Sequence, residues 1–269
     1  MYGLQFGDTG LPPKGDIMNG WVLGSNTSHW KGKINFNKMY DADVKWWYTK
    51  ASDANRTTGE LFEDDRFREY SEAASKTSLL KGCFHWLQAS VDPTVAADYY
   101  LERYQMYDFE FPPILDFEET SVRDTGMYSD FAWRAQMWCK RVEEVTGRKP
   151  FIYTANWYTS YFKTSYLSWM NAYPLMVADY SWWSNNVTKK PYYFPSNIWN
   201  KEDCDYWQYT DSAHGPDYGV EALGLCLNWF MGSYADLLIQ LEIEPPTPPT
   251  LSLEEQVDIL WQAHPELHT

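Results

Sequence analysis

Short apolar and aromatic runs recur along the chain with helix-like stretches between several of them, and this alternation constrains the fold more than any other feature. The runs predict strands near residues 21–28, 44–52, 79–87, 112–118, 150–155, 174–180, 205–210 and 225–230. Helical patterns lie near 63–77, 92–104 and 128–147; Asp92-Pro93 opens the second, and Gly147 ends the third. The alternation predicts parallel strands, most simply a TIM-like (β/α) barrel of the α/β class, regular or irregular.

In such barrels the chemistry lies at the carboxyl ends of the strands. The polar residues expected there are Asn26, Ser28, Asp53, His85, Asp116, Glu118, Asn156, Asp179, Tyr180, Gln208, Tyr209 and Asn228.

Changes in amino-acid composition along the chain predict four segments. We expect an N-terminal extension (1–20), the barrel (21–242), a stiff proline-rich linker (243–251) and a C-terminal helix (252–269). Ser252 and Glu255 match a capping box, and an apolar stripe follows them. That stripe needs a cover. The helix could fold back on the barrel, form an oligomer with another copy, or dock a partner.

Composition excludes several classes of function. The net charge of −15 argues against a nucleic-acid partner. No run of about 18 apolar residues is present, so membrane insertion is not expected. The first 16 residues lack the basic and apolar regions of a signal peptide. The four cysteines are irregularly spaced and the five histidines form no metal-binding motif, so we expect no metal and no cofactor.

The aromatic fraction of 18%, with 15 Trp and 21 Tyr, is more than a core alone needs. Such rings combine an apolar face with a polar atom, which suits sugars as well as protein interiors. Carbohydrate binding and an aromatic-rich core both remain open.

The sharpest local signal is the stretch PPILDFEE at residues 112–119. Strand periodicity places Asp116 and Glu118 on one face, at the barrel mouth. Two neighbouring carboxyls raise each other's proton affinity, so one can act as an acid while the other stays charged, as glycoside hydrolysis requires. Alternating acids on an exposed strand edge are the alternative. Glu119 alternates with Glu118 and is expected to face solvent.

Eight segments resemble, in order, the motifs of the family 25 glycoside hydrolases, the Chalaropsis-type lysozymes. They are SHWKGKINF (28–36), WYTKAS (47–52), GCFHW (82–86), PILDFE (113–118), TGRKPFIYT (146–154), PLMVADY (174–180), WQYT (207–210) and LNWF (227–230). The resemblance covers roughly residues 21–240.

The resemblance implies a muramidase that cuts the β-1,4 bond between N-acetylmuramic acid and N-acetylglucosamine in bacterial peptidoglycan. It makes Glu118 the catalytic acid and Asp116 the stabilising carboxylate. The expected substrate-binding residues are Asn26, Asp53, Tyr153, Asp179, Tyr180, Trp207 and Tyr209. Such an enzyme would act on the cell wall, either outside the cell or after release by lysis.

Three positions depart from the family pattern. Asn26 and Cys226 stand where the family usually has Asp, and Asp53 stands where it usually has Glu. Loss of two negative charges weakens stabilisation of a cationic transition state and lowers the proton affinity of Glu118. A glycan-binding module without catalysis, or a phage structural component, is therefore the alternative to an active enzyme.

Overall fold

The computed structural model describes residues 20–119, 122, 125–180 and 191–244. Its strands are β1 (Val22–Thr27), β2 (Trp46–Ala54), β3 (Leu61–Glu63), β4 (Leu80–Trp86), β5 (Ile114–Asp116), β6 (Phe151–Ala155), β7 (Leu175–Ala178), β8 (Tyr206–His214) and β9 (Gly224–Phe230). Each of the eight predicted strand regions overlaps one of these strands, although β2, β8 and β9 extend beyond the predicted bounds, and β3 is additional.

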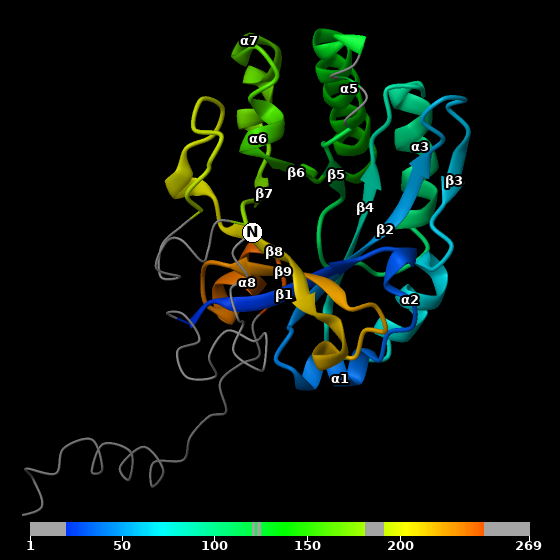
Figure 1. Cartoon of the computed structure of the whole chain (residues 1–269), viewed down its shortest axis with the longest axis vertical. Coiled ribbons are helices and arrows are strands. Elements are labelled where there is room, and N and C mark those ends of the chain that lie inside the picture. Colours follow the sequence, from blue (N-terminus) through cyan, green and yellow to red (C-terminus); the bar gives the residue numbers. More distant parts are fainter. Residues whose placement is uncertain (1–19, 120–121, 123–124, 181–190, 245–269) are drawn as a thin grey trace, which may run out of the picture.

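Eight strands close into a barrel, because β1 pairs with both β2 and β9 (Figure 1). Neighbours from β1 through β2 and β4 to β8 run parallel, whereas β9 is antiparallel to β8 and to β1. The expectation of parallel strands is therefore wrong for β9. Only nine residues (215–223), among them the 3₁₀ helix Gly215–Tyr218, lie between β8 and β9, and a parallel return needs a longer crossover. The short β3 pairs with β2 as a hairpin beside the barrel.

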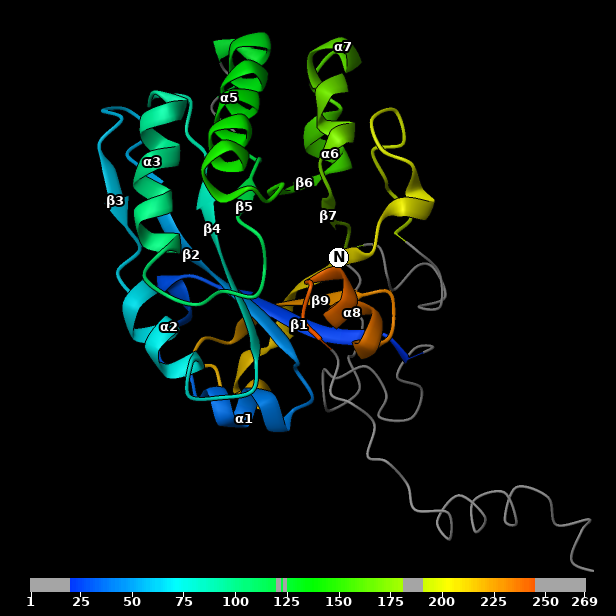
Figure 2. The same ribbon diagram turned by 180° about the vertical axis from the view of Figure 1, so that it is seen from behind.

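The α-helices are α1 (Phe36–Asp41), α2 (Phe67–Ala74), α3 (Pro93–Tyr104), α5 (Tyr128–Thr146), α6 (Asn156–Thr159), α7 (Thr164–Leu167) and α8 (Tyr234–Gln240). Figure 2 shows α2, α3 and α5 along the outside of the sheet, with α8 beside β1 and β9. Local sequence explains the helix ends that were predicted. The Asp92 side chain accepts hydrogen bonds from the first amides of α3, and Gly147 ends α5 with a φ of 70°.

Strand alternation divides the core in two. Trp47 and its outward-facing counterparts pack against the helices, where Trp47 contacts Phe36 and Tyr70. Trp46 and Tyr206 point into the barrel, and their rings meet edge to face. Leu237, Leu238 and Leu241, in α8 and just after it, belong to this inner core. The helix therefore covers one end of the barrel, a role that the sequence analysis did not foresee.

The ring of Trp46 occupies the space inside the barrel that a side chain at position 24 would need. A Cβ atom added to Gly24 would lie 2.0 Å from Cε2 of Trp46, so only glycine fits there.

The segments predicted as an N-terminal extension, a linker and a C-terminal helix fall almost entirely on residues 1–19 and 245–269, outside the described residues. Within the described part of the chain, no helix is long and apolar enough to cross a membrane.

Candidate active site

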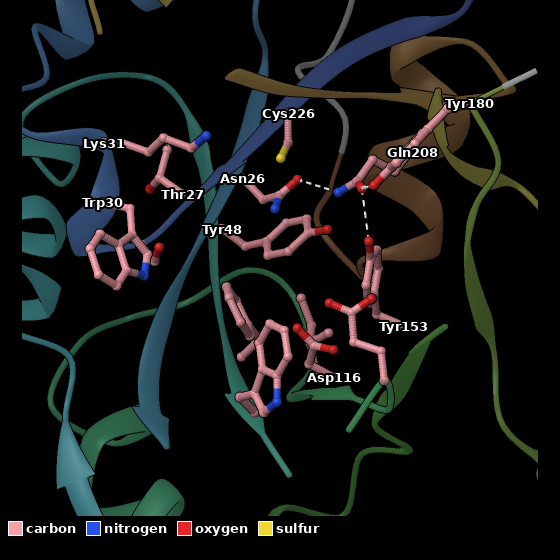
Figure 3. Close-up of a pocket in the computed structure, with 15 residues that line it drawn as sticks. Asn26, Thr27, Trp30, Lys31, Tyr48, Asp116, Tyr153, Tyr180, Gln208 and Cys226 are labelled. Atoms are coloured by element: carbon pink, nitrogen blue, oxygen red, sulfur yellow. Dashed lines mark hydrogen bonds between the residues drawn. The ribbon is translucent and has the colours of Figure 1, made fainter. Parts of the chain in front are cut away.

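A pocket of about 220 Å³ opens at the carboxyl ends of the parallel strands (Figure 3). Its lining combines aromatic, amide and acidic side chains from most strands of the barrel. The lining residues are Asn26, Thr27, Ser28, Trp30, Lys31, Tyr48, Phe84, Trp86, Ile114, Asp116, Glu118, Tyr153, Tyr180, Gln208 and Cys226.

The strand β5 and the residues after it carry both predicted carboxyls to this pocket. Leu115 and Phe117 face outward into the core under the helices, so Asp116 and Glu118 face the pocket. The backbone beyond β5 is held in place by the next elements along the chain. Thr154 Oγ1 donates to the Phe117 carbonyl at 2.9 Å, and Tyr158 Oη donates to the Glu119 carbonyl at 2.6 Å.

Glu119 does not face solvent as predicted; its side chain is 0% exposed. Its Oε1 lies 3.3 Å from Nε of Arg56, in the turn between β2 and β3. Glu119 follows Leu115 and Phe117 on the side of the chain that faces away from the pocket, and that side is buried core and not solvent.

Burial dominates the electrostatics of the two carboxyls. It raises the pKa of Glu118 to about 7. Burial also raises the pKa of Asp116, and the neighbouring Glu118 and Asp53 add to that rise, whereas the Lys50 ammonium opposes it. Oδ1 of Asp116 is buried and has no hydrogen-bond partner among the described residues. A buried carboxylate oxygen without a partner is costly, and a place in a reactive site is one explanation for it.

A bulge in β2 explains how Lys50 and Asp53 come together. Lys50 pairs with Phe84 and Ser52 with His85, so Ala51 is an extra residue. The bulge places Lys50 and Asp53 on the same side of the strand, although they are three residues apart. Lys50 Nζ lies 2.9 Å from Oδ2 of Asp53, and Lys50 is only 7% exposed.

Asp53 is occupied by protein donors instead of lining the pocket. Besides Lys50, it accepts hydrogen bonds from the Ala54 amide at 2.7 Å and from Gln88 Nε2 at 2.9 Å. Lys50 in turn lies 5.8 Å from the ring centre of Trp86, a pocket residue that pairs with Asp116 across β4 and β5. Asp53 therefore positions a buried cation beside the carboxyl pair.

An amide network forms another part of the pocket. Oε1 of Gln208 accepts hydrogen bonds from the hydroxyls of Tyr153, at 2.8 Å, and of Tyr180. Nε2 of Gln208 donates to Oδ1 of Asn26 at 2.8 Å, and Nδ2 of Asn228 donates to the same atom at 3.1 Å. Figure 3 shows this chain of contacts from Tyr153 to Asn26. It fixes the orientation of three predicted substrate-binding residues, Asn26, Tyr153 and Tyr180.

Cys226 reaches the pocket because β9 is antiparallel, which brings the early part of that strand to the mouth of the barrel. Its cross-strand partner is Asn26. Burial raises the pKa of the Cys226 thiol to about 11, so the thiol is neutral at physiological pH. The two positions at which the sequence departs from an expected acid are thus neighbours in space.

Besides Asp53, three more of the predicted substrate-binding residues do not line the pocket. Trp207 and Tyr209 face outward into the core under the helices, and the ring of Tyr209 stacks on Trp229. Asp179 is buried, and its Oδ2 accepts hydrogen bonds from the amides of Tyr192 and Tyr193 at 2.6 and 3.0 Å.

The sequence analysis also missed pocket residues, among them Tyr48, Trp86, Trp30 and Lys31. Period-two alternation is the signal that could have found Tyr48, since it lies two residues before Lys50 on the same face of β2. The same alternation turns Gln208 toward the pocket and its neighbours Trp207 and Tyr209 away from it. Among the described residues, no group of three or more His, Cys, Asp or Glu side chains is arranged to hold a metal ion.

Curated relatives give a first comparison. The uncharacterized protein YegX of Escherichia coli (strain K12) is 29% identical over 164 residues, which cover 59% of this chain and 56% of that protein. Lysozyme M1 of Streptomyces globisporus is 28% identical over 228 residues, which cover 81% of this chain and 70% of that protein. The chain thus spans little more than half the length of YegX.

Solved structures share the barrel. The bacterial lysozyme from Streptomyces coelicolor aligns with a TM-score of 0.64 at 24% identity, covering 81% of this chain and 95% of that chain. A family GH25 lysozyme from Aspergillus fumigatus aligns with a TM-score of 0.65 at 19% identity, covering 83% and 100%. These likenesses concern the fold.

The match to a protein family is the most direct comparison. Residues 26–218, from the end of β1 to the turn before β9, match the family described as glycosyl hydrolases family 25. The matched region is well over half of the chain and includes Asp116, Glu118 and the members of the amide network other than Asn228. This chain therefore belongs to glycosyl hydrolases family 25.

Proposed function

We propose that this chain is a lysozyme that hydrolyses the β-1,4 bond between N-acetylmuramic acid and N-acetylglucosamine in bacterial peptidoglycan. One observation carries the proposal: Asp116 and Glu118 share a pocket that also presents aromatic rings and amides. The lysozymes among its relatives support the same activity. Its site of action would be the cell wall.

In this proposal Glu118 is the general acid. Its pKa of about 7 keeps a large fraction of the side chain protonated near neutral pH. Glu118 donates that proton to the glycosidic oxygen as the bond to the leaving sugar breaks. It then takes a proton from the water that completes hydrolysis. The rate is expected to fall above about pH 7, as the proton of the free enzyme is lost.

Asp116 acts as the anion that stabilises positive charge developing on the sugar or its N-acetyl group. Two carboxyls this close favour a state that shares one proton. Burial raises the pKa of both carboxyls, and the Lys50 ammonium opposes that rise at Asp116, which favours leaving the proton on Glu118. The amide network fixes the orientation of the Tyr153, Tyr180 and Asn26 side chains, and these side chains would contact the substrate.

The test is to incubate the chain with purified peptidoglycan and to identify the new reducing ends. A muramidase generates reducing N-acetylmuramic acid, whereas a glucosaminidase generates reducing N-acetylglucosamine. Turbidity of the wall suspension gives the rate.

A second candidate is a glycan-binding protein without catalysis. It is favoured by Asn26 and Cys226, which face each other in the pocket where the family resemblance leads us to expect carboxylates. Binding to walls with no new reducing ends would support this candidate and exclude the enzyme.

A further inference from the structure

One side of the pocket is formed by residues that the proposed chemistry does not use. The 3₁₀ helix His29–Lys31 follows β1, and both Trp30 and Lys31 line the pocket. Figure 3 shows them on the side opposite Tyr180 and Gln208, with Asn26 and Tyr48 between. The pocket therefore has a wall suited to binding that lies apart from its acid-base centre.

The Trp30 side chain is a large apolar ring that is exposed to solvent. Its side of the pocket is open, and the residue is 76% exposed. Isolated exposed aromatics are common, but this one lines a pocket with acidic and amide groups. An indole face of this kind suits the apolar face of a pyranose ring.

The turn that carries Trp30 is rigidly supported. Nδ1 of His29 lies 2.7 Å from Oδ2 of Asp64, and the His29 amide donates to Oδ1 of Asp64 at 3.0 Å. The Lys31 amide closes the turn on the Ser28 carbonyl at 3.0 Å, and the imidazole of His29 lies 4.4 Å from the Trp30 ring, centre to centre. A ring fixed in this way loses little conformational entropy when a ligand binds.

Lys31 places a positive charge on the same wall. Its ammonium donates to the Gly224 carbonyl at 2.7 Å, which uses one of its three donors. Burial raises the pKa of the Cys226 thiol and the Lys31 charge opposes that rise, so the charge acts within the pocket. The acidic residues that line the pocket are Asp116 and Glu118, Asp211 also acts on the Cys226 thiol, and the chain as a whole carries −15. An anionic group on a ligand would therefore be attracted to the Lys31 side and repelled from the carboxyl side.

We propose that Trp30 and Lys31 form a subsite for a sugar that carries a lactyl carboxylate, with the pyranose on the indole and the carboxylate on the ammonium. The inference rests on the proposed function, because it assigns the muramoyl units of the glycan to this wall. The lactyl carboxylate is the group that distinguishes a muramoyl from a glucosaminyl unit. The subsite thus gives the groove a preference for strands with free lactyl carboxylates.

The test compares two soluble ligands, peptide-free glycan strands with free lactyl carboxylates and the same strands after reduction of those carboxylates to alcohols. Dissociation constants and kcat and KM values are measured for the parental chain, Lys31→Met, Trp30→Ala and Lys33→Met. Lys33 is the matched control, because it carries the same charge two residues away, has an exposed position and does not line the pocket.

The parental chain is expected to bind the carboxylate strands about threefold to fivefold more tightly than the reduced strands, a preference that shrinks with added salt. Lys31→Met should abolish that preference, and Lys33→Met should keep it. Trp30→Ala should weaken binding of both strands by about fivefold.

A preference that survives Lys31→Met, or that Lys33→Met removes equally, would overturn the subsite. Binding without cleavage by the parental chain would refute the proposed function but leave the binding comparison valid. Failure of the parental chain to bind either strand would overturn both.

Discussion

Replacement of Lys50 by methionine tests how the proton is divided between the two carboxyls. The ammonium lies 2.9 Å from Asp53 and lowers the pKa of Asp116. Methionine is similar in length and apolar, so it removes the charge and little volume. Without the cation the pKa of Asp116 rises further, and the proton shared by the pair moves toward Asp116.

The size of the effect follows from the surroundings of Lys50. At an effective dielectric constant of about 20, a unit charge within about 4–8 Å of a carboxyl contributes roughly 2–4 kcal/mol. Water in the open pocket screens part of this, which leaves a rise of about one pKa unit in Asp116, or about 1.4 kcal/mol. Because activity requires ionised Asp116, the acid limb of the kcat/KM profile moves about one unit to higher pH. At pH values below that limb, kcat/KM of Lys50→Met is about tenfold lower than that of the parental chain.

The assay is the pH dependence of kcat/KM on soluble glycan fragments, with two control variants. Lys50→Arg keeps the charge and should keep the acid limb near its parental position. Lys81→Met removes another buried ammonium, 2.9 Å from Glu110 and near the opposite end of β4 from the pocket. It should lower the free energy of unfolding by an amount similar to that of Lys50→Met, about 2 kcal/mol, without moving the profile.

An acid limb that stays in place in Lys50→Met would refute the reasoning, as would an equal displacement in Lys81→Met. The alkaline limb reports Glu118, whose pKa is raised by burial, and should move little in either variant.

Three further predictions concern the pocket charges, the barrel interior and the chain ends. Asn26→Asp and Cys226→Asp each add an anion to the pocket, so each should raise the pKa of Glu118 and move the alkaline limb of the pH–rate profile upward; unchanged profiles in both would place these positions outside its electrostatic reach. Gly24→Ala forces a methyl group against Trp46 and should lower the free energy of unfolding by about 3 kcal/mol in urea titrations, whereas a loss below about 1 kcal/mol would contradict the packing argument. A truncation ending at Glu244 should retain activity on short soluble glycan fragments; loss of activity in a truncated protein that still melts cooperatively would show that the chain beyond it contributes to catalysis.

Local signals predicted the barrel well because they report directly on burial. Each apolar run became a strand, and the ends of α3 and α5 follow from Asp92 and Gly147. The direction of β9 could not be predicted in this way. It depends on the length of the connection after β8, and the sequence analysis counted strands without comparing their connections.

The site was predicted in part, and the failures have a common cause. Asp116 and Glu118 share a strand end, so local periodicity was enough to bring them together. Trp207 and Tyr209 were expected in the groove from the family resemblance, but alternation along β8 turns both outward and Gln208 inward.

Contacts between segments that are far apart in the sequence could not be predicted from local sequence patterns. The bulge that brings Asp53 to Lys50 depends on the register between β2 and β4. The burial of Glu119 depends on Arg56, more than 60 residues earlier in the chain. Neither the register nor that contact leaves a local signal in the sequence.

The central claim is that Glu118 supplies the proton that breaks the glycosidic bond. Glu118→Gln is nearly isosteric and removes only the transferable proton, so it isolates that role. The decisive measurement is the release of reducing ends from purified peptidoglycan by the parental chain and by Glu118→Gln, with wall binding measured on the same samples. We predict that the variant binds walls as the parental chain does and releases no reducing ends above background. Cleavage by the variant at the parental rate would contradict the assignment.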